Sequence, residues 1–177
     1  MGKMPLPKQL SDKEKKDVHK ERPPFLAKKS IEFTENPKLY DKKPTNIEDF
    51  SNLYFEIWKL SSKPYQQEYW NKHGQWGDNY SETMETFLGD CRAVLDTSDY
   101  AVEMTPKQRE MLQKFYDMME DYEADPKAVS DPGYGVNDAA IIEDPLFAKC
   151  REYAKLVYEE LSGDDLEAWE KATEKKS

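Results

Sequence analysis

The residue types that most often carry catalysis or bind metals are few and widely spaced in this chain. The 177 residues include two histidines, His19 and His73, and two cysteines, Cys91 and Cys150. No His-x-x-x-His, Cys-x-x-Cys or Glu-x-x-His spacing occurs. Because zinc and other transition metals need several such ligands close together, the sequence predicts no metal site.

The two cysteines are predicted to be buried and unreactive. Cys91 and Cys150 both fall in the apolar phase of predicted helices, where a small hydrophobic side chain is the usual role of cysteine. A nucleophilic thiol needs a nearby histidine or other cation that lowers its pKa, and the sequence indicates none. The chain has no secretory signal, so a reduced intracellular protein is favoured over a disulfide-bonded, secreted one.

One turn superficially resembles a calcium loop. An EF-hand that starts at Asp131 needs oxygen side chains at positions 133 and 135 and a glutamate at 142, where the sequence has Gly133, Gly135 and Ile142. The same segment is too short to cradle a phosphate and lacks the lysine for it. No cofactor is therefore expected, and the protein is not expected to be an enzyme. An enzyme whose site assembles from scattered carboxylates and tyrosines stays open as an alternative.

The charge of the chain changes sign near residue 45. The first 45 residues carry 12 Lys and Arg against 7 Asp and Glu, whereas the remainder carries 14 against 29. The first stretch also holds six of the eleven prolines. This contrast predicts an extended basic, proline-rich N-terminal arm at 1–44 and an acidic helical domain at 45–177.

The arm spaces apolar side chains among prolines and lysines, which is typical of an extended segment that presses isolated anchors into grooves. The predicted anchors are Phe25, Leu26, Phe33 and Tyr40. A solvated, disordered tail is the alternative interpretation of this composition.

Apolar residues at helical spacing, with capping signals before them, predict the domain. A Thr45-to-Glu48 capping box precedes a helix over 45–58, and further helices are predicted at 64–70, 78–96, 105–123 and 144–161, with a short one from 164. No stretch alternates like a strand. The predicted fold is all-α, an irregular helical bundle of about five helices.

Two further groups are predicted to bind partners. Acidic residues crowd the end of the 105–123 helix, where the helix dipole already places partial negative charge, and they would suit a cationic partner; they are Asp117, Glu120, Asp121 and Glu123. Two aromatic residues, Trp76 and Tyr134, lie beside glycines in predicted loops, and loop aromatics are frequent interface anchors.

The predicted function is a non-catalytic helical accessory or structural subunit of a larger protein complex, which docks through its arm and exposed aromatics. The alternative is an acidic inhibitor, nucleic-acid mimic or chaperone of a basic partner. Direct nucleic-acid binding is disfavoured by the acidic domain. No apolar run reaches the length of a membrane span, so peripheral association with a membrane complex is the only membrane role compatible with the sequence. An intracellular location is expected, in the cytoplasm or an organelle interior such as the mitochondrion.

Overall fold

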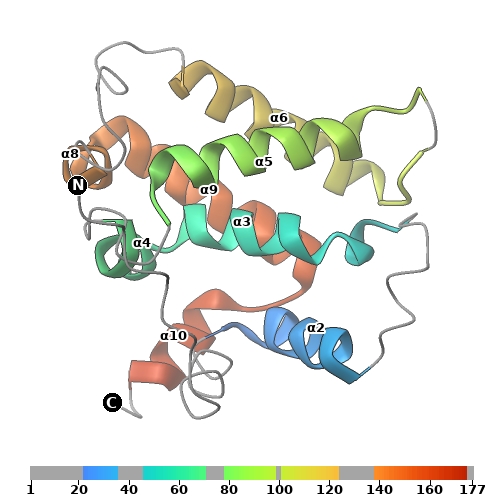
Figure 1. Cartoon of the computed structure of the whole chain (residues 1–177), viewed down its shortest axis with the longest axis horizontal. Helices are drawn as coiled ribbons and strands as arrows, with labels where there is room; N and C mark the ends of the chain where they lie inside the picture. The colour runs from blue at the N-terminus through green and yellow to red at the C-terminus, as the bar shows by residue number, and fades with distance from the viewer. Residues whose placement is uncertain (1–21, 36–45, 71–77, 99–100, 124–137, 175–177) are drawn as a thin grey trace, which may run out of the picture.

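The computed structural model describes residues 22–35, 46–70, 78–98, 101–123 and 138–174, and these residues are mostly helical, with no β-strand among them (Figure 1). The described elements are eight α-helices and one 3-10 helix: α2 (Pro24–Glu35), η2 (Ile47–Asp49), α3 (Ser51–Ser61), α4 (Lys63–Tyr69), α5 (Tyr80–Leu95), α6 (Pro106–Glu123), α8 (Asp138–Glu143), α9 (Pro145–Ser162) and α10 (Leu166–Glu174). The all-α prediction is confirmed, with more helices than the five expected.

Helix α3 is the centre of the fold. It packs against α9, α5, α2 and α4, and Figure 1 shows α5 above it, α9 behind it and α2 below it. Seven of its eleven residues are buried, which is more than one amphipathic face can supply. Helices α2, α4, α5 and α9 therefore enclose α3, and both cavities described below are lined in part by its residues.

The chain enters α3 through a break that the sequence did not reveal. Asn46, rather than Thr45, caps the first turn, and its amide side chain and the carboxylate of Asp49 form a reciprocal capping box around η2. Phe50 has φ −93° and ψ 58°, which is not helical, so α3 begins only at Ser51. The single helix predicted over 45–58 is thus wrong, because the backbone turns at Phe50.

Other predicted helix starts are confirmed. Thr105 and Gln108 cap α6 reciprocally, with N–H···O distances of 2.8 and 3.1 Å. Asp144 caps α9 by accepting a hydrogen bond from the Leu146 amide at 2.9 Å. Pro145 occupies the first position of this helix. Helix α8 was not predicted, because six residues are too few to show helical periodicity.

The prediction of an extended arm is wrong for residues Pro24–Glu35, which form α2. Pro24 occupies the first position of this helix, where the N–H that proline lacks would have no partner in any case. The division into arm (1–44) and domain (45–177) stays a prediction, since residues 1–21 and 36–45 lie outside the described part of the chain.

Three contacts hold α2 on the body of the protein. The Phe25 ring stacks on Tyr54 with centroids 4.4 Å apart, and Leu26 is buried in the core. The backbone N–H of Phe25 donates to Asp164 Oδ2 at 3.1 Å. Asp164 also accepts the Tyr158 hydroxyl at 2.7 Å, so one carboxylate joins α2 to the end of α9.

Gly163 ends α9 in the left-handed conformation, with φ 78° and ψ 0°. We expect Gly163→Ala to lower the free energy of unfolding by about 1 kcal/mol, because a side chain disfavours positive φ. Gly89 lies inside α5 with open space around it, so Gly89→Ala should raise the same quantity by roughly 0.5 to 1 kcal/mol. Urea unfolding of both variants measures the difference, and equal effects would contradict the assignment.

Candidate functional site

The main surface feature is an aromatic groove between the α3–α4 corner and α10. It has a volume of about 470 Å³. Its lining contains four aromatic rings, one proline and three glutamates, together with smaller polar residues: Trp58, Ser62, Pro64, Tyr65, Glu68, Tyr69, Trp169, Glu170, Thr173 and Glu174. None of the described residues that line it is basic.

Helix α4 forms one wall of the aromatic groove. Ser62 caps α4 by accepting a hydrogen bond from the Tyr65 amide at 3.2 Å, and Pro64 occupies its first turn. The spacing of four residues places Tyr65 and Tyr69 on one face, with ring centroids 4.5 Å apart. Trp58 of α3 meets Tyr65 edge-on, with ring centroids 5.4 Å apart. The α3–α4 corner thus presents three adjoining rings.

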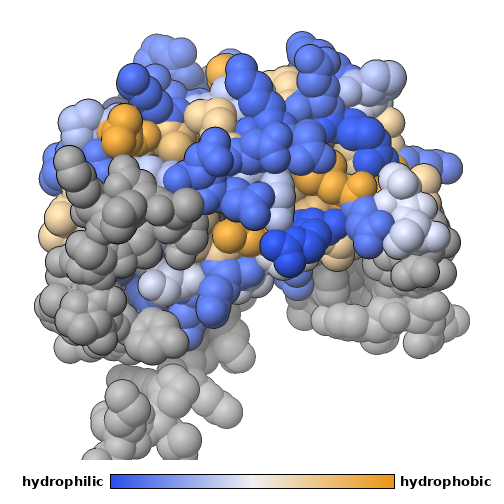
Figure 2. Space-filling model, turned by 90° about the horizontal axis from the view of Figure 1, so that it is seen from above, coloured by the Kyte–Doolittle hydropathy of each residue, from blue (hydrophilic) through white to orange (hydrophobic). Residues whose placement is uncertain are grey.

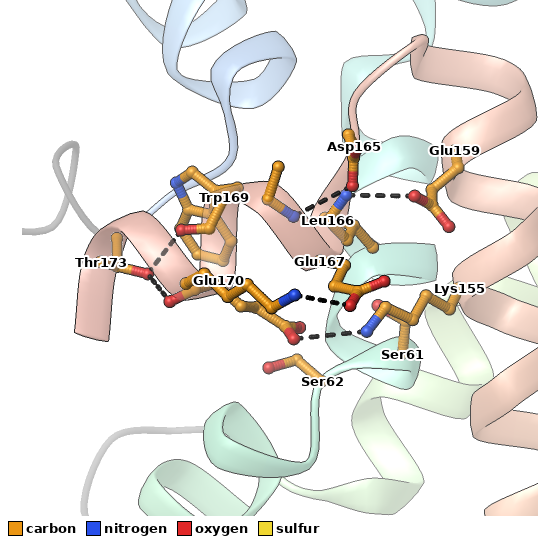
Figure 3. Close-up of polar contacts among 12 residues, drawn as sticks. Ser61, Ser62, Lys155, Glu159, Asp165, Leu166, Glu167, Trp169, Glu170 and Thr173 are labelled. Carbon is orange, nitrogen blue, oxygen red and sulfur yellow. Dashed lines mark hydrogen bonds and ion pairs between the residues drawn. The ribbon is translucent and has the colours of Figure 1, made fainter. Parts of the chain in front are cut away.

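Helix α10 forms the opposite wall (Figure 3). The Leu166 amide at its start donates to Glu159 Oε2 of α9 at 3.1 Å, and the Leu166 side chain is buried. Lys155 of α9 forms an ion pair with Glu170 at 3.3 Å. Trp169 lies between these anchors and meets Trp58 edge-on, with centroids 6.1 Å apart. The helix is therefore fixed against α9 at one edge and against Trp58 at its centre.

The electrostatics of the aromatic groove favour a cation. Tyr65 donates a short hydrogen bond to Asp78, and burial together with the negative charge of Asp78 raises the pKa of Tyr65. Its ring is therefore neutral, with an electron-rich face. Ring faces attract ammonium and guanidinium groups, and the glutamates at the rim add negative charge. Among the described lining residues, the Ser62 hydroxyl accepts from the Tyr65 amide and the Thr173 hydroxyl donates to the backbone carbonyls of Trp169 and Glu170, so neither hydroxyl is paired with a general base.

A second polar feature lies in the interior. Glu56 of α3 is 4% exposed, and its Oε2 has no hydrogen-bond partner. Burial raises the pKa of Glu56 to about 9, and the charge of Asp90 on α5 and a hydrogen bond with it add to the shift. At neutral pH the Glu56 carboxyl is therefore protonated and donates to Asp90.

This buried carboxyl lies apart from two of the protein's cavities. Glu56 lines neither the aromatic groove nor the cavity between α2 and α3 described below. The neighbouring Lys59 is paired with Asp78 at 3.5 Å. A strongly shifted carboxylate is a common mark of an active site, but it needs access to substrate. The pKa of Glu56 is strongly shifted, but neither of these two cavities gives a substrate access to its carboxyl.

The cysteines are free and buried. Burial raises the pKa of both thiols, and the negative charge of Glu56 in its ionised form would add to the effect at Cys91. In the described part of the chain, no group of three His, Cys, Asp or Glu side chains could hold a metal ion.

Several predicted partner-binding residues are placed by the structure, and the aromatic groove brings none of them together. Phe25 and Leu26 contact this chain's own α3 and core, as described above. Asp117, Glu120 and Asp121 are exposed on α6. Helix α6 lies at the top of Figure 1, and the face seen from above in Figure 2 is mostly hydrophilic.

The remaining predicted residues cannot be placed in the same way. Tyr40, Trp76 and Tyr134 lie outside the described residues, as do the side chains of Phe33 and Glu123. All of these assignments stay predictions.

Sequence reasoning missed the aromatic groove because its walls are far apart in the chain. The sequence predicts a helix at 64–70 and a short one from 164, and gives no sign that the two lie side by side. The available signal was an aromatic pair four residues apart on a helix of seven residues, too short to bury both rings by itself. Nothing in the sequence indicated that α10 would face them.

Among the described helices, none is both long and apolar enough to cross a membrane. Comparison with protein-family models, curated proteins and solved structures found no match to this chain.

Glu56 gives the stability of the protein a defined pH dependence. The folded state holds a proton on Glu56 up to about pH 9, whereas the unfolded state releases it near its ordinary value of 4.5. Between these values, each rise of one pH unit removes about 1.4 kcal/mol from the free energy of unfolding. Glu56→Gln imitates the protonated form, so its advantage over wild type should grow from pH 5 to pH 8.

Urea unfolding at several pH values measures this difference, with Glu85→Gln on the exposed side of α5 as the matched control. The control should follow the wild-type curve. Parallel curves for Glu56→Gln and wild type would show that Glu56 is ionised in the folded protein.

Proposed function

We propose that this protein is a non-catalytic helical interaction subunit whose aromatic groove binds a positively charged, proline-containing segment of a partner protein. The observation that carries the proposal is the lining of the groove, whose described residues combine four aromatic rings with three glutamates, one of them paired with Lys155, and include no basic residue. The groove supplies the docking surface of an accessory subunit inside the cell, and the part of the N-terminal arm that precedes α2 is proposed to cross a neighbouring subunit.

Two properties of the occupant follow from the rings. An ammonium or guanidinium group is attracted to the face of an aromatic ring, most strongly to tryptophan. Proline-rich segments are already extended, so they lose little conformational entropy when they dock between aromatic side chains. A groove of about 470 Å³ lined by Trp58, Tyr65 and Trp169 has room for a few such side chains.

Charge complementarity supports the same class of partner. The chain carries a net charge of −10, which steers a basic segment towards it and accelerates encounter at low salt. At the groove itself, Glu68 and Glu174 lie on opposite walls, so a cation between them meets negative charge from both sides. Binding should accordingly weaken as the salt concentration rises.

The hypothesis of an acidic mimic or inhibitor stays as the second candidate, because Asp117, Glu120 and Asp121 are exposed together on α6. It requires binding at α6 rather than at α4 and α10. An enzyme stays the weakest alternative, because the shifted carboxyl of Glu56 has no cavity beside it among those described.

The test is an NMR titration of the isotope-labelled full chain with a peptide of about a dozen residues that alternates proline and lysine. We expect shifts at the indole N–H of Trp58 and Trp169 and at the amides of α4 and α10. Peptides that alternate proline with glutamate, or serine with lysine, should bind much more weakly. Shifts centred on α6 would instead support the acidic mimic, and no saturable shift at any site would overturn the proposal.

Four variants sharpen the result. Trp169→Ala should weaken binding about 30-fold, since loss of a central aromatic anchor typically costs about 2 kcal/mol. Trp169→Phe should keep most of the affinity, which separates loss of the ring from loosening of α10. Glu68→Gln should weaken binding more than Glu120→Gln, although both remove one negative charge. Equal losses would show that only the overall charge matters.

A further inference from the structure

A separate cavity lies between α2 and α3. It has a volume of about 370 Å³. The described residues of its lining are two basic, three neutral polar and two apolar ones, and none of them is acidic: Arg22, Leu26, Lys29, Ser30, Ser51, Asn52 and Phe55. In a chain with ten excess negative charges, a cavity lined in this way is unexpected.

Arg22 is held in a fixed position at this cavity. Its guanidinium lies over the Phe55 ring, 4.4 Å from the centroid, and its Nη1 donates to Ser30 Oγ at 3.0 Å. Ser30 Oγ in turn donates to the Leu26 carbonyl at 2.9 Å, so the acceptor is itself oriented. Such contacts leave the other N–H groups of the guanidinium for a further acceptor.

No carboxylate in the described part of the chain balances the charge of Arg22. Its contacts there are a hydroxyl and an aromatic ring, and only tyrosines raise its pKa, while partial burial lowers it. A partly buried cation without an acid partner loses hydration without regaining an ion pair. An anion in the cavity would restore that balance.

The remaining lining residues define the anion. The Lys29 ammonium lies 5.5 Å from the Phe25 ring centroid and borders the same cavity. Ser51 and Asn52 at the start of α3 add neutral hydrogen-bonding side chains. One guanidinium, one ammonium and several neutral donors suit the tetrahedral oxygens of a phosphate.

The cavity also exceeds the size of a phosphate ion and falls in the range of about 300 to 1,000 Å³ that is typical of small-molecule sites. Leu26 and Phe55 provide its apolar surface. We propose that the α2–α3 cavity binds a small phosphate monoester. Arg22 and Lys29 hold the phosphate group, while the organic group contacts Leu26 and Phe55.

Binding at this cavity would connect α2 to α3 through the ligand. Helix α2 contributes Leu26, Lys29 and Ser30, and Arg22 directly precedes it in the chain. Helix α3 contributes Ser51, Asn52 and Phe55. A ligand that contacts both helices stabilises their association by mass action. Protection of α2 amides from hydrogen exchange should therefore rise with ligand concentration.

The test is an NMR titration of the labelled full chain with phenyl phosphate at constant ionic strength, beside inorganic phosphate and sodium chloride. We expect saturable shifts at residues 22–30 and 51–55, with phenyl phosphate binding more tightly than inorganic phosphate. Equal binding of the two phosphates would overturn the monoester assignment. Shifts that chloride reproduces, or that lie elsewhere, would overturn the site.

Charge variants distinguish a built site from general attraction of anions. Arg22→Gln and Lys29→Gln should each weaken phenyl phosphate binding about tenfold or more, since charge-assisted hydrogen bonds are among the strongest. Lys28→Gln is the matched control, because Lys28 is an exposed neighbour on α2 that does not line the cavity. Equal losses for Lys28→Gln and Lys29→Gln would overturn the proposal. Arg22→Lys should recover part of the affinity if α2 stays docked.

Discussion

The fold depends on the burial of α3. Seven of its eleven residues are buried, and a single neighbouring helix cannot cover that many side chains, so α2, α4, α5 and α9 all pack against it. The same enclosure buries a carboxyl group, because one of the enclosed residues is Glu56. A carboxyl at that depth keeps its proton and uses Asp90 as acceptor, while the aromatic side chains of α3 that reach the outer surface become the walls of both cavities.

Phe55 and Trp58 link the two candidate sites. Phe55 borders the α2–α3 cavity, and it stacks on Trp58, which borders the aromatic groove, with centroids 5.9 Å apart. The two sites nevertheless favour ligands of opposite charge, because one is lined by Arg22 and Lys29 and the other by glutamates. Side by side on one helix, they present a surface with two distinct recognition chemistries.

Local signals in the sequence were enough to predict the helical class and most helix starts, since a capping box such as Thr105–Gln108 involves residues three apart. Two kinds of feature were out of reach. The turn at Phe50 and the helix that begins at Pro24 depend on backbone conformations that the neighbouring residue types do not determine. The groove depends on α10 folding back onto α3, where Trp169 meets Trp58 more than a hundred positions earlier in the chain.

The proton on Glu56 has a thermodynamic consequence for the whole molecule. At neutral pH the unfolded chain carries this side chain ionised, so folding takes one proton from the solution and the buffer must supply it. The heat measured on unfolding therefore includes the ionisation heat of the buffer. Calorimetric enthalpies obtained in Pipes and in Tris, whose ionisation heats differ, would differ at the same pH and temperature, although the same contacts between α3 and α5 are broken in both.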